Sequence, residues 1–447
     1  MKNKPALSFW QIWNMSFGFL GIQFGWGLQM ANMSAIYSYL GANPGQIALL
    51  WLAAPITGVL IQPLVGQASD RTWTRIGRRR PYILAGAILA SLALIFMPNS
   101  PSVWVAAGLL WVLDGTINAS MQPFRALVAD NLPEEQESQG FAIQSLFIGL
   151  GGTVASALPW MMTNWFGIIA EGAGKGHIPF SVTLSFYIGA AAFLGAVLWT
   201  VFTTKEIPPE ESEIAVFRAR KFDWTLGLKD ILSLFGHLPR RMWELGLVQF
   251  FTWIGMFCLW VYFSPTIAIN IFHAQAGSVD MEASGAWAGF CFAMYNAVCF
   301  VFSFVLLRTT KWIGPKLMHT LCLGVGAVGL LSISLMTGKY GLLFSMTCIG
   351  IAWASILSMP YAMLAPSLPT DKVGVLMGMF NLFIVFPQII ASAFLGKIVE
   401  IFFANNPMNA MIIGGVSMGI ASVTTIFVVR YKKTTAGANL NNVAPGH

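Results

Sequence analysis

The chain has 447 residues, of which 56% are hydrophobic and only 10% are charged, whereas about a quarter of the residues in ordinary soluble domains are charged. A single globular core cannot bury that much apolar surface, and residues 5–69 contain no Asp, Glu, Lys or Arg. The composition therefore excludes a soluble enzyme and predicts an integral membrane protein. The net charge of +7 would also suit a nucleic-acid-binding protein, so the positions of the charges must decide between these classes.

Twelve apolar segments are long enough to cross a bilayer as helices. In chain order they lie near residues 10–39, 45–68, 80–98, 102–130, 138–166, 179–203, 242–272, 284–307, 315–336, 340–365, 373–402 and 408–430. With the N-terminus inside, all of the 25 Lys and Arg residues except Lys175, Lys339 and Lys397 fall on the inner side. Basic residues concentrate in cytoplasmic loops, so we expect a multi-pass protein of the cell (inner) membrane, surrounded by lipid and without a nucleic-acid partner. Both termini are expected in the cytoplasm.

The longest polar connection, residues 204–241, divides the chain into two halves of six spans each, residues 1–203 and 242–447. Short matches recur between the halves at an offset of 237 residues, and they pair Pro123 with Pro360 and Gln144 with Asn381. Halves with six spans run in the same direction across the membrane. The sequence thus predicts an all-α protein with the major facilitator fold, which is built from two pseudo-symmetric six-helix halves.

The connection between the second and third spans contains a concentrated group of charges. Residues 66–81 read GQASDRTWTRIGRRRP, which places an acid at the end of one helix and a basic cluster in a tight turn beside it. One interpretation is simple anchoring on the inner side or a basic patch that faces lipid. The other is a salt-bridged latch that closes the cytoplasmic side, and a related run at residues 308–316 favours it. The residues expected in this gate are Asp70, Arg71, Arg78 and Arg79.

The fourth span carries Asp114, Asn118, Gln122 and Arg125, and steps of four, four and three residues place them on one helical face. A carboxylate at mid-membrane costs roughly 3 kcal/mol, so it normally faces a cavity or a partner. A structural acid paired with a neighbouring span is the alternative. No second carboxylate is available to build a cation site, so a single titrating proton is simpler than sodium. Arg125 is expected either to pair with Asp130 or to reach towards Asp114 in another state.

Amide and aromatic side chains are scattered through the otherwise apolar spans. An amide satisfies hydroxyl groups as donor and acceptor, and an aromatic face covers the C–H face of a sugar ring. Each residue alone is better explained by helix packing or by an interfacial belt, but together they predict a neutral polyhydroxyl ligand. The candidate residues are Gln23, Trp26, Gln29, Gln144, Gln249, Trp253, Tyr295, Asn296, Tyr361, Asn381 and Gln388, with Trp260 and Trp353 in the same spans.

The cysteines, the histidines and one glycine run indicate no catalytic chemistry. The five cysteines lie within or at the ends of apolar spans and the five histidines lie in loops or at span ends, without the spacing of a metal site. Residues 149–152, GLGG, follow no strand and lie within a span, so they predict close helix packing rather than phosphate binding. We therefore expect no enzyme activity, no cofactor and no metal.

Three stretches resemble the sucrose/proton symporters of plants and their bacterial and animal relatives that transport disaccharides. Residues 51–81 resemble the family's second and third spans, residues 111–130 resemble its fourth span, and residues 247–262 resemble its seventh. The resemblance implies a proton-driven disaccharide importer in which Asp114 binds the proton and contacts the sugar, and Arg125 is a second essential residue.

Two departures from this pattern leave the sugar open. The plant family usually has two adjacent asparagines after the aspartate, where this chain has only Asn118. The family's acidic segment after the seventh span reads Tyr262-Phe-Ser-Pro265 here. Sucrose, maltose and related α-glucosides all fit as the substrate of a monomeric symporter that works by alternating access. Sodium-coupled glycoside uptake and a transporter-like sugar sensor remain as alternative functions.

Overall fold

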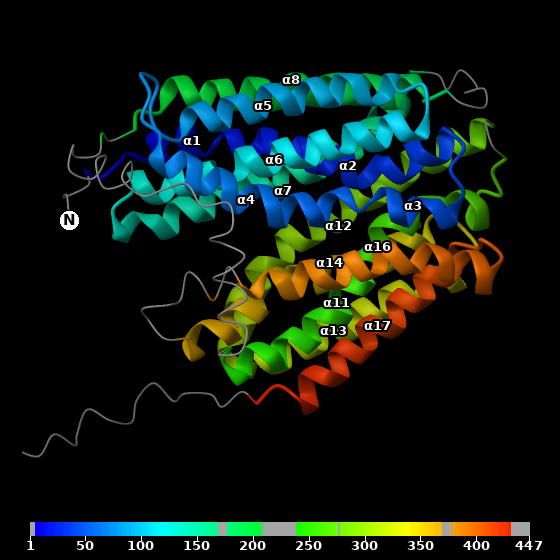
Figure 1. The fold of residues 1–447 in the computed structure, drawn as a ribbon. Coiled ribbons are helices and arrows are strands. Elements are labelled where there is room, and N and C mark those ends of the chain that lie inside the picture. Colours follow the sequence, from blue (N-terminus) through cyan, green and yellow to red (C-terminus); the bar gives the residue numbers. More distant parts are fainter. Residues whose placement is uncertain are drawn as a thin grey trace, which may run out of the picture.

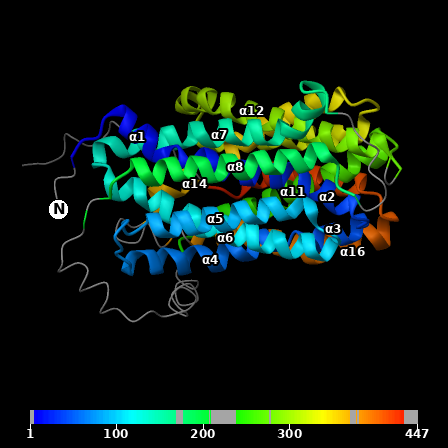
Figure 2. The same cartoon turned by 90° about the horizontal axis from the view of Figure 1, so that it is seen from above.

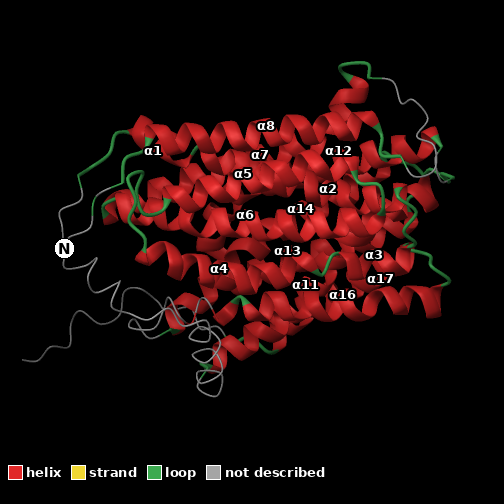
Figure 3. Ribbon diagram, turned by 45° about the horizontal axis from the view of Figure 1, so that its top comes forward, coloured by secondary structure: helices red, strands yellow, loops and turns green. Residues whose placement is uncertain are grey.

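The protein is described by a computed structural model that covers residues 5–168, 177–206, 208, 238–275, 278–368, 376 and 379–430. Within these ranges the regular elements are helices, and the one β-type contact is a bridge between Thr74 and Gly77 (Figure 3). The all-α prediction is confirmed. Most of the predicted linker, residues 204–241, lies outside the described residues.

The first half of the chain forms the upper layer of helices in Figure 1. Its helices are α1 (Phe9–Ser16), α2 (Gly18–Tyr39), α3 (Pro44–Leu50), α4 (Ala53–Arg71), α5 (Arg80–Phe96), α6 (Val103–Asn131), α7 (Glu134–Asn164) and α8 (Phe180–Thr203). The second half forms the lower layer. Its helices are α11 (Arg240–Thr266), which continues as a π-helical turn (Ile267–Ile271), α12 (Val279–Ile313), α13 (Pro315–Ser332), α14 (Gly341–Leu364), α16 (Leu382–Phe403) and α17 (Met408–Phe427).

Eleven helical segments in the described part of the chain are long and apolar enough to cross a membrane. The twelfth long helix is α2, whose 22 residues span about 33 Å. It carries Gln23, Gln29 and Asn32, and these amides lower its hydropathy. The helices run alongside one another in the view of Figure 2, as a twelve-span bundle requires.

The first two predicted spans are each interrupted, which the sequence reading missed. Helix α1 ends at Ser16 and α2 begins at Gly18 because the Thr200 hydroxyl enters the junction, where it accepts from the Gly18 N–H at 2.9 Å and donates to the Asn14 carbonyl at 2.8 Å. The second span divides into α3 and α4 around residues 51–52. A side chain that bonds to both backbone groups at a break replaces the helical hydrogen bond that is lost there.

Helix α12 begins at Val279, five residues before the predicted start of its span. Ser278 caps it by accepting the Met281 N–H, and Asp280 and Glu282 occupy its first turn. Acidic residues stabilise the first turn of a helix because the exposed N–H groups carry positive charge. A search for apolar residues therefore placed the start of this helix too late.

The largest contacts between the two halves join α7 with α12, α3 with α16 and α2 with α11, and smaller contacts join α4 with α16, α2 with α12 and α3 with α11. Helices α3 and α16 lie side by side at the end of the molecule opposite the N-terminal residues (Figure 1), and we call this the outer end. There the Ser392 hydroxyl donates to the Ala48 carbonyl at 2.6 Å, and Gly396 lies directly against the backbone of Gly45. The Tyr39 hydroxyl donates to the Met281 carbonyl at 3.4 Å across the same interface. The outer end is therefore closed.

Ion pairs at the opposite, inner end lie within single halves. Arg79 pairs with Asp130 and Arg80 with Glu206 in the first half, and Arg240 pairs with Glu244 in the second. Among the described side chains, these pairs do not link one half to the other.

Candidate functional site

Asp114 lies near the middle of α6 and is completely buried. The Gln29 side-chain amide on α2 donates to Asp114 Oδ1 at 2.7 Å, and the second oxygen, Oδ2, has no hydrogen-bond partner among the described residues. An unpaired acceptor in a buried environment costs about 1–3 kcal/mol. Such an oxygen is suited to receive a proton or a ligand hydroxyl, so this carboxyl is the centre of the candidate site.

Helix α4 supports Asn118, which lies one turn after Asp114. The Gln62 amide donates to Asn118 Oδ1 at 2.6 Å, and the Asn118 amide donates to the Asp114 carbonyl at 2.8 Å and to the Thr57 hydroxyl at 3.4 Å. Gln122 is packed beside Gly66 of the same helix. The predicted polar face of the fourth span therefore lies against α4, and this contact fixes the side-chain orientation below Asp114.

The sequence reading missed Thr57 and Gln62. Gln62 carried a usable signal, because it is an amide inside an apolar span like the residues that were selected. Thr57 carried none, because a threonine within a helix usually bonds to its own backbone. Thr57 does so too, donating to the Ala53 carbonyl at 2.9 Å.

Arg125 does not pair with Asp130 in this structure, because the Asp130 carboxylate accepts from Arg79 Nε at 2.9 Å. Five residues along a helix turn the side chain by roughly 140°, which directs Arg125 and Asp130 to different sides of α6. Arg125 is exposed, and its charge acts on the Tyr361 hydroxyl of α14. Tyr361 donates to Asn381 Oδ1 at 3.2 Å. Side chains from both halves thus approach one another on the inner side of Asp114.

Four aromatic residues from three helices of the second half form one cluster, which we call the aromatic cluster. The Trp353 ring lies 5.8 Å from Trp253, 5.4 Å from Trp260 and 6.0 Å from Tyr295, and Trp253 lies 5.8 Å from Trp260. The Trp253 indole N–H is buried without a partner among the described residues. The cluster therefore combines large apolar faces with a buried donor that has no partner among the described residues.

Gln249 lies one turn before Trp253 on α11 and is 1% exposed. Neither its side-chain oxygen nor its side-chain nitrogen has a hydrogen-bond partner in the described part of the chain. The Gln144 side-chain nitrogen on α7 is also buried and has no hydrogen-bond partner among the described residues. Buried amides are nearly always hydrogen-bonded, so these two add donors and an acceptor that a polar ligand can use.

Helix α2 connects the two groups of residues. Gln29 donates to Asp114 of the first half, and five residues later the Ser34 hydroxyl donates to the Trp260 carbonyl of the second half at 3.4 Å. A movement of one half against the other must alter the α2–α11 contact. The environment of Asp114 is therefore mechanically linked to the aromatic cluster.

The remaining predicted ligand residues are less directly placed. Gln23 of α2 lies against Gly151 of α7, and Asn296 of α12 lies against Gly152. The glycine run therefore serves close helix packing. Trp26 is partly buried against the core, and Gln388 donates to the Ile384 carbonyl of its own helix at 3.0 Å.

The basic turn before α5 is held by an acid that the sequence reading missed. The Glu206 carboxylate accepts the backbone N–H groups of Arg78, Arg79 and Arg80 at 2.8–3.0 Å. Gly77 has φ of +123°, and the Glu206 carboxylate lies too close to this residue to leave room for a Cβ. Glutamate therefore caps α5 at its positive end.

Two further arginine contacts attach this turn to neighbouring helices of the first half. Arg79 donates to Asp130 on α6 and, at 2.6 Å, to the Ser69 hydroxyl on α4. The side chains of Asp70 and Arg71 lie outside the described residues.

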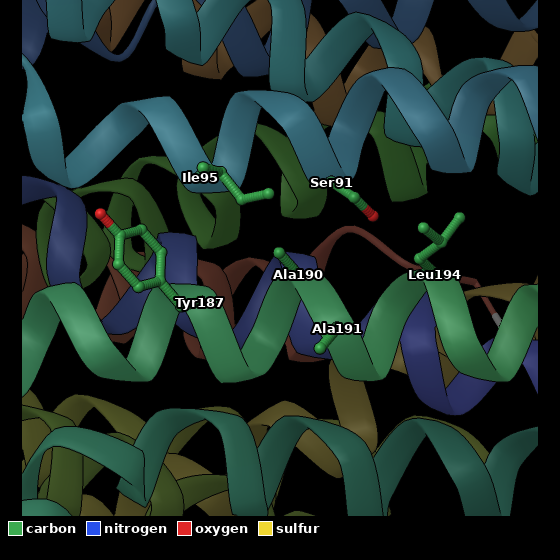
Figure 4. A pocket seen from close by; sticks show the side chains of 6 residues that line it. All are labelled: Ser91, Ile95, Tyr187, Ala190, Ala191 and Leu194. Carbon is green, nitrogen blue, oxygen red and sulfur yellow. The ribbon is translucent and has the colours of Figure 1, made fainter.

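A small cavity of about 260 Å³ lies between α5 and α8 (Figure 4). It is lined by Ser91, Ile95, Tyr187, Ala190, Ala191 and Leu194. None of these is a candidate residue, and the lining is almost entirely apolar. This cavity is separate from Asp114.

Comparison with known proteins places this arrangement in a family. The family described as Major Facilitator Superfamily matches residues 15–392. The chain belongs to this superfamily. It is therefore a multi-pass membrane transporter, and the predicted fold is confirmed.

Named relatives support the resemblance to the sucrose transporters that the sequence indicated. The chain is 25% identical to the sucrose transport protein SUC4 of Arabidopsis thaliana, covering 92% of this chain and 88% of that one. It is 26% identical to the sucrose transport protein SUT5 of Oryza sativa subsp. indica, covering 96% and 88%.

Solved structures of other transporters share the fold. The nucleoside transporter NupG aligns with a TM-score of 0.69 and 16% identity over 95% of this chain and 100% of that one. A bacterial homologue of the human drug peptide transporters PepT1 and PepT2 aligns with a TM-score of 0.68 and 14% identity, over 94% and 97%. At these identities the likeness concerns the fold alone.

Proposed function

We propose that this transporter is a proton-coupled symporter that imports a disaccharide, namely sucrose, maltose or a related α-glucoside. The observation that carries the proposal is the buried Asp114 carboxyl, with one oxygen held by Gln29 and the other without a partner among the described residues. Two named relatives are sucrose transport proteins, which supports a sugar as the substrate.

In this mechanism the proton binds to Asp114 Oδ2 and converts the carboxylate to a neutral acid. A neutral acid is far less costly than a charge in a site closed to water. It also offers an O–H donor to the sugar, while Oδ1 keeps its bond from Gln29. The acid therefore links the protonation state to the conformation and to sugar binding.

The disaccharide is bound between Asp114 and the aromatic cluster. Gln249 and Gln144 supply amide groups to its hydroxyls, and the indole N–H of Trp253 supplies a further donor. The indole faces cover the C–H faces of the sugar rings. These groups come from both halves, so the sugar stabilises the state in which the halves close around it.

Alternating access follows from a rocking motion of the two halves. With both termini in the cytoplasm, the present structure is the state that is closed towards the outside. Arg125 and Asn381, both exposed, then face the cytoplasmic opening. When the inner end closes, the inner ends of the two halves approach each other around Arg125 and Asn381. The turn at Arg78 and Arg79, which Glu206 caps, moves with the first half as a rigid unit. A monomer suffices for this cycle.

Uptake of labelled disaccharides into proteoliposomes, with and without an imposed pH gradient, tests the proposal. Accumulation of sucrose, maltose or a related α-glucoside that requires the pH gradient and ends on addition of a protonophore is the expected result. If uptake requires sodium, or if the sugar accumulates when no ion gradient is imposed, proton coupling is refuted. Binding without transport assigns the protein to sugar sensing instead.

A further inference from the structure

A second cavity, of about 670 Å³, lies at the outer end between the two halves. Its walls come from the end of α7, the first part of α12 up to Phe290 and the residues around the start of α14, and Asp114 is not among its lining residues. The volume is in the range of small-molecule sites, about 300–1,000 Å³. The lining residues on which the argument rests are Trp160, Asn164, Glu282, Trp287, Phe290 and Lys339.

Glu282 is the polar centre of this outer cavity. Its side chain is 3% exposed, and the Ser181 hydroxyl of α8 donates to its Oε1 at 2.9 Å across the boundary between the halves. Its Oε2 is buried and has no hydrogen-bond partner among the described residues. A buried carboxylate oxygen without a donor is costly, so a ligand with hydroxyl groups supplies what this oxygen lacks.

Aromatic rings form the apolar wall of the cavity. Phe290 lies 4.5 Å from Trp160 and 5.3 Å from Trp287, measured between ring centroids. The Lys339 ammonium lies 5.3 Å from the centroid of Trp287. Rings that alternate with polar groups suit the C–H and O–H faces of a sugar.

The charges of the lining favour a ligand without net charge. Glu282 and Lys339 are the charged members of the lining, and their charges cancel. The Asn164 side-chain nitrogen donates to the Trp160 carbonyl of its own helix at 2.9 Å. The side-chain oxygen of Asn164 is then the group that can accept from a ligand. The wall thus offers carboxylate and amide oxygens as acceptors and one ammonium as donor, the complement of a polyhydroxyl compound.

We propose that the outer cavity is a second sugar-binding site, in which Glu282 accepts hydroxyl groups of the disaccharide before it reaches Asp114. The inference rests on the proposed function for the choice of sugar. The Trp160–Phe290 contact and the Ser181–Glu282 bond both cross the interface of the halves. Opening of the outer end therefore separates the walls of this site and releases the sugar towards the centre.

A cysteine-protection experiment tests the site directly. Ala283 lines the cavity and is exposed, and the five native cysteines are all buried, so an Ala283→Cys protein should react selectively with an impermeant thiol reagent. Sucrose and maltose are added as protectants to the full-length protein in vesicles with the outer end exposed to the reagent. We expect protection by at least one of these sugars, and its absence overturns the proposal.

Three variants in the Ala283→Cys background sharpen the test. Glu282→Gln should raise the sugar concentration that gives half-maximal protection about tenfold or more, because a charged hydrogen-bond acceptor is lost. Asp280→Asn removes an exposed acid from the same turn without touching the cavity, and it should leave protection unchanged. Equal effects of both variants overturn the role of Glu282. The unprotected labelling rate shows whether each variant is folded.

The third variant, Asp114→Asn, separates this site from the central one. Protection that persists in Asp114→Asn supports an independent site, and protection that disappears refutes it. Protection by glycerophosphoethanolamine without protection by disaccharides assigns the cavity to a lipid head group and also refutes the proposal. Protection does not require transport, so a protected protein that fails to accumulate sugar contradicts the proposed function alone.

Discussion

Replacement of Asp114 by Asn is the sharpest test of proton coupling. Asparagine keeps the shape of the side chain and an oxygen that can accept from Gln29. In the native structure this hydrogen bond, from Gln29 to Asp114 Oδ1, is 2.7 Å long. It removes the proton-binding oxygen, Oδ2, which has no partner among the described residues. The substitution therefore deletes the chemistry while it preserves the packing.

The size of the effect follows from the energy of the proton gradient. One pH unit corresponds to about 1.4 kcal/mol per proton, which supports about tenfold accumulation when one proton accompanies each sugar. Wild-type proteoliposomes under such a gradient should reach this ratio, whereas two coupled protons would give about a hundredfold. Asp114→Asn should stop at equal concentrations inside and outside, a ratio of about one.

The assay combines concentrative uptake with counterflow of labelled sugar. Counterflow needs binding and rocking but no net proton movement, so Asp114→Asn should retain it. Folding is checked by thermal unfolding in detergent, where the loss of a charge-assisted hydrogen bond and the removal of a buried charge oppose each other. If Asp114→Asn accumulates sugar tenfold under a one-unit gradient, Asp114 is not the coupling group and the argument from its burial is wrong.

Three further predictions concern other parts of the structure. Trp253→Ala should raise the KM for sugar at least tenfold, since it removes one face of the aromatic cluster, and it should also lower the thermal stability because the ring is buried; an unchanged KM in the folded variant would place the sugar elsewhere. Glu206→Gln should destabilise the first half by about 2 kcal/mol in denaturant unfolding, because one charged group accepts three N–H groups; equal stability would contradict the capping role. Gly396→Val should push α16 from Gly45 of α3 and increase labelling of the Ala283→Cys thiol at the outer end, and unchanged labelling would show that this contact does not hold the outer end closed.

The order and number of the spans followed from the sequence alone, because membrane insertion acts on each segment separately. A long stretch without charges, such as residues 5–69, is stable as helices within the bilayer wherever the neighbouring helices lie. The shared face of Asp114 and Asn118 was also predictable, since it depends only on the 3.6-residue period of one helix.

Helix boundaries could not be predicted where contacts with neighbouring segments or capping residues change the start or end of a helix. The break before Gly18 depends on Thr200, which is 182 residues away. The early start of α12 depends on capping and on acids in its first turn, which an apolar count treats as loop.

The partners of the candidate residues were decided only by the tertiary structure. Gln29 bonds to Asp114 across 85 positions, and the partner of Asp130 is Arg79 rather than Arg125. Periodicity gives the face on which a side chain lies, but the rotation and spacing of neighbouring helices decide what meets that face. The sequence by itself therefore determined which residues are unusual in a membrane, and packing decided which of them act together.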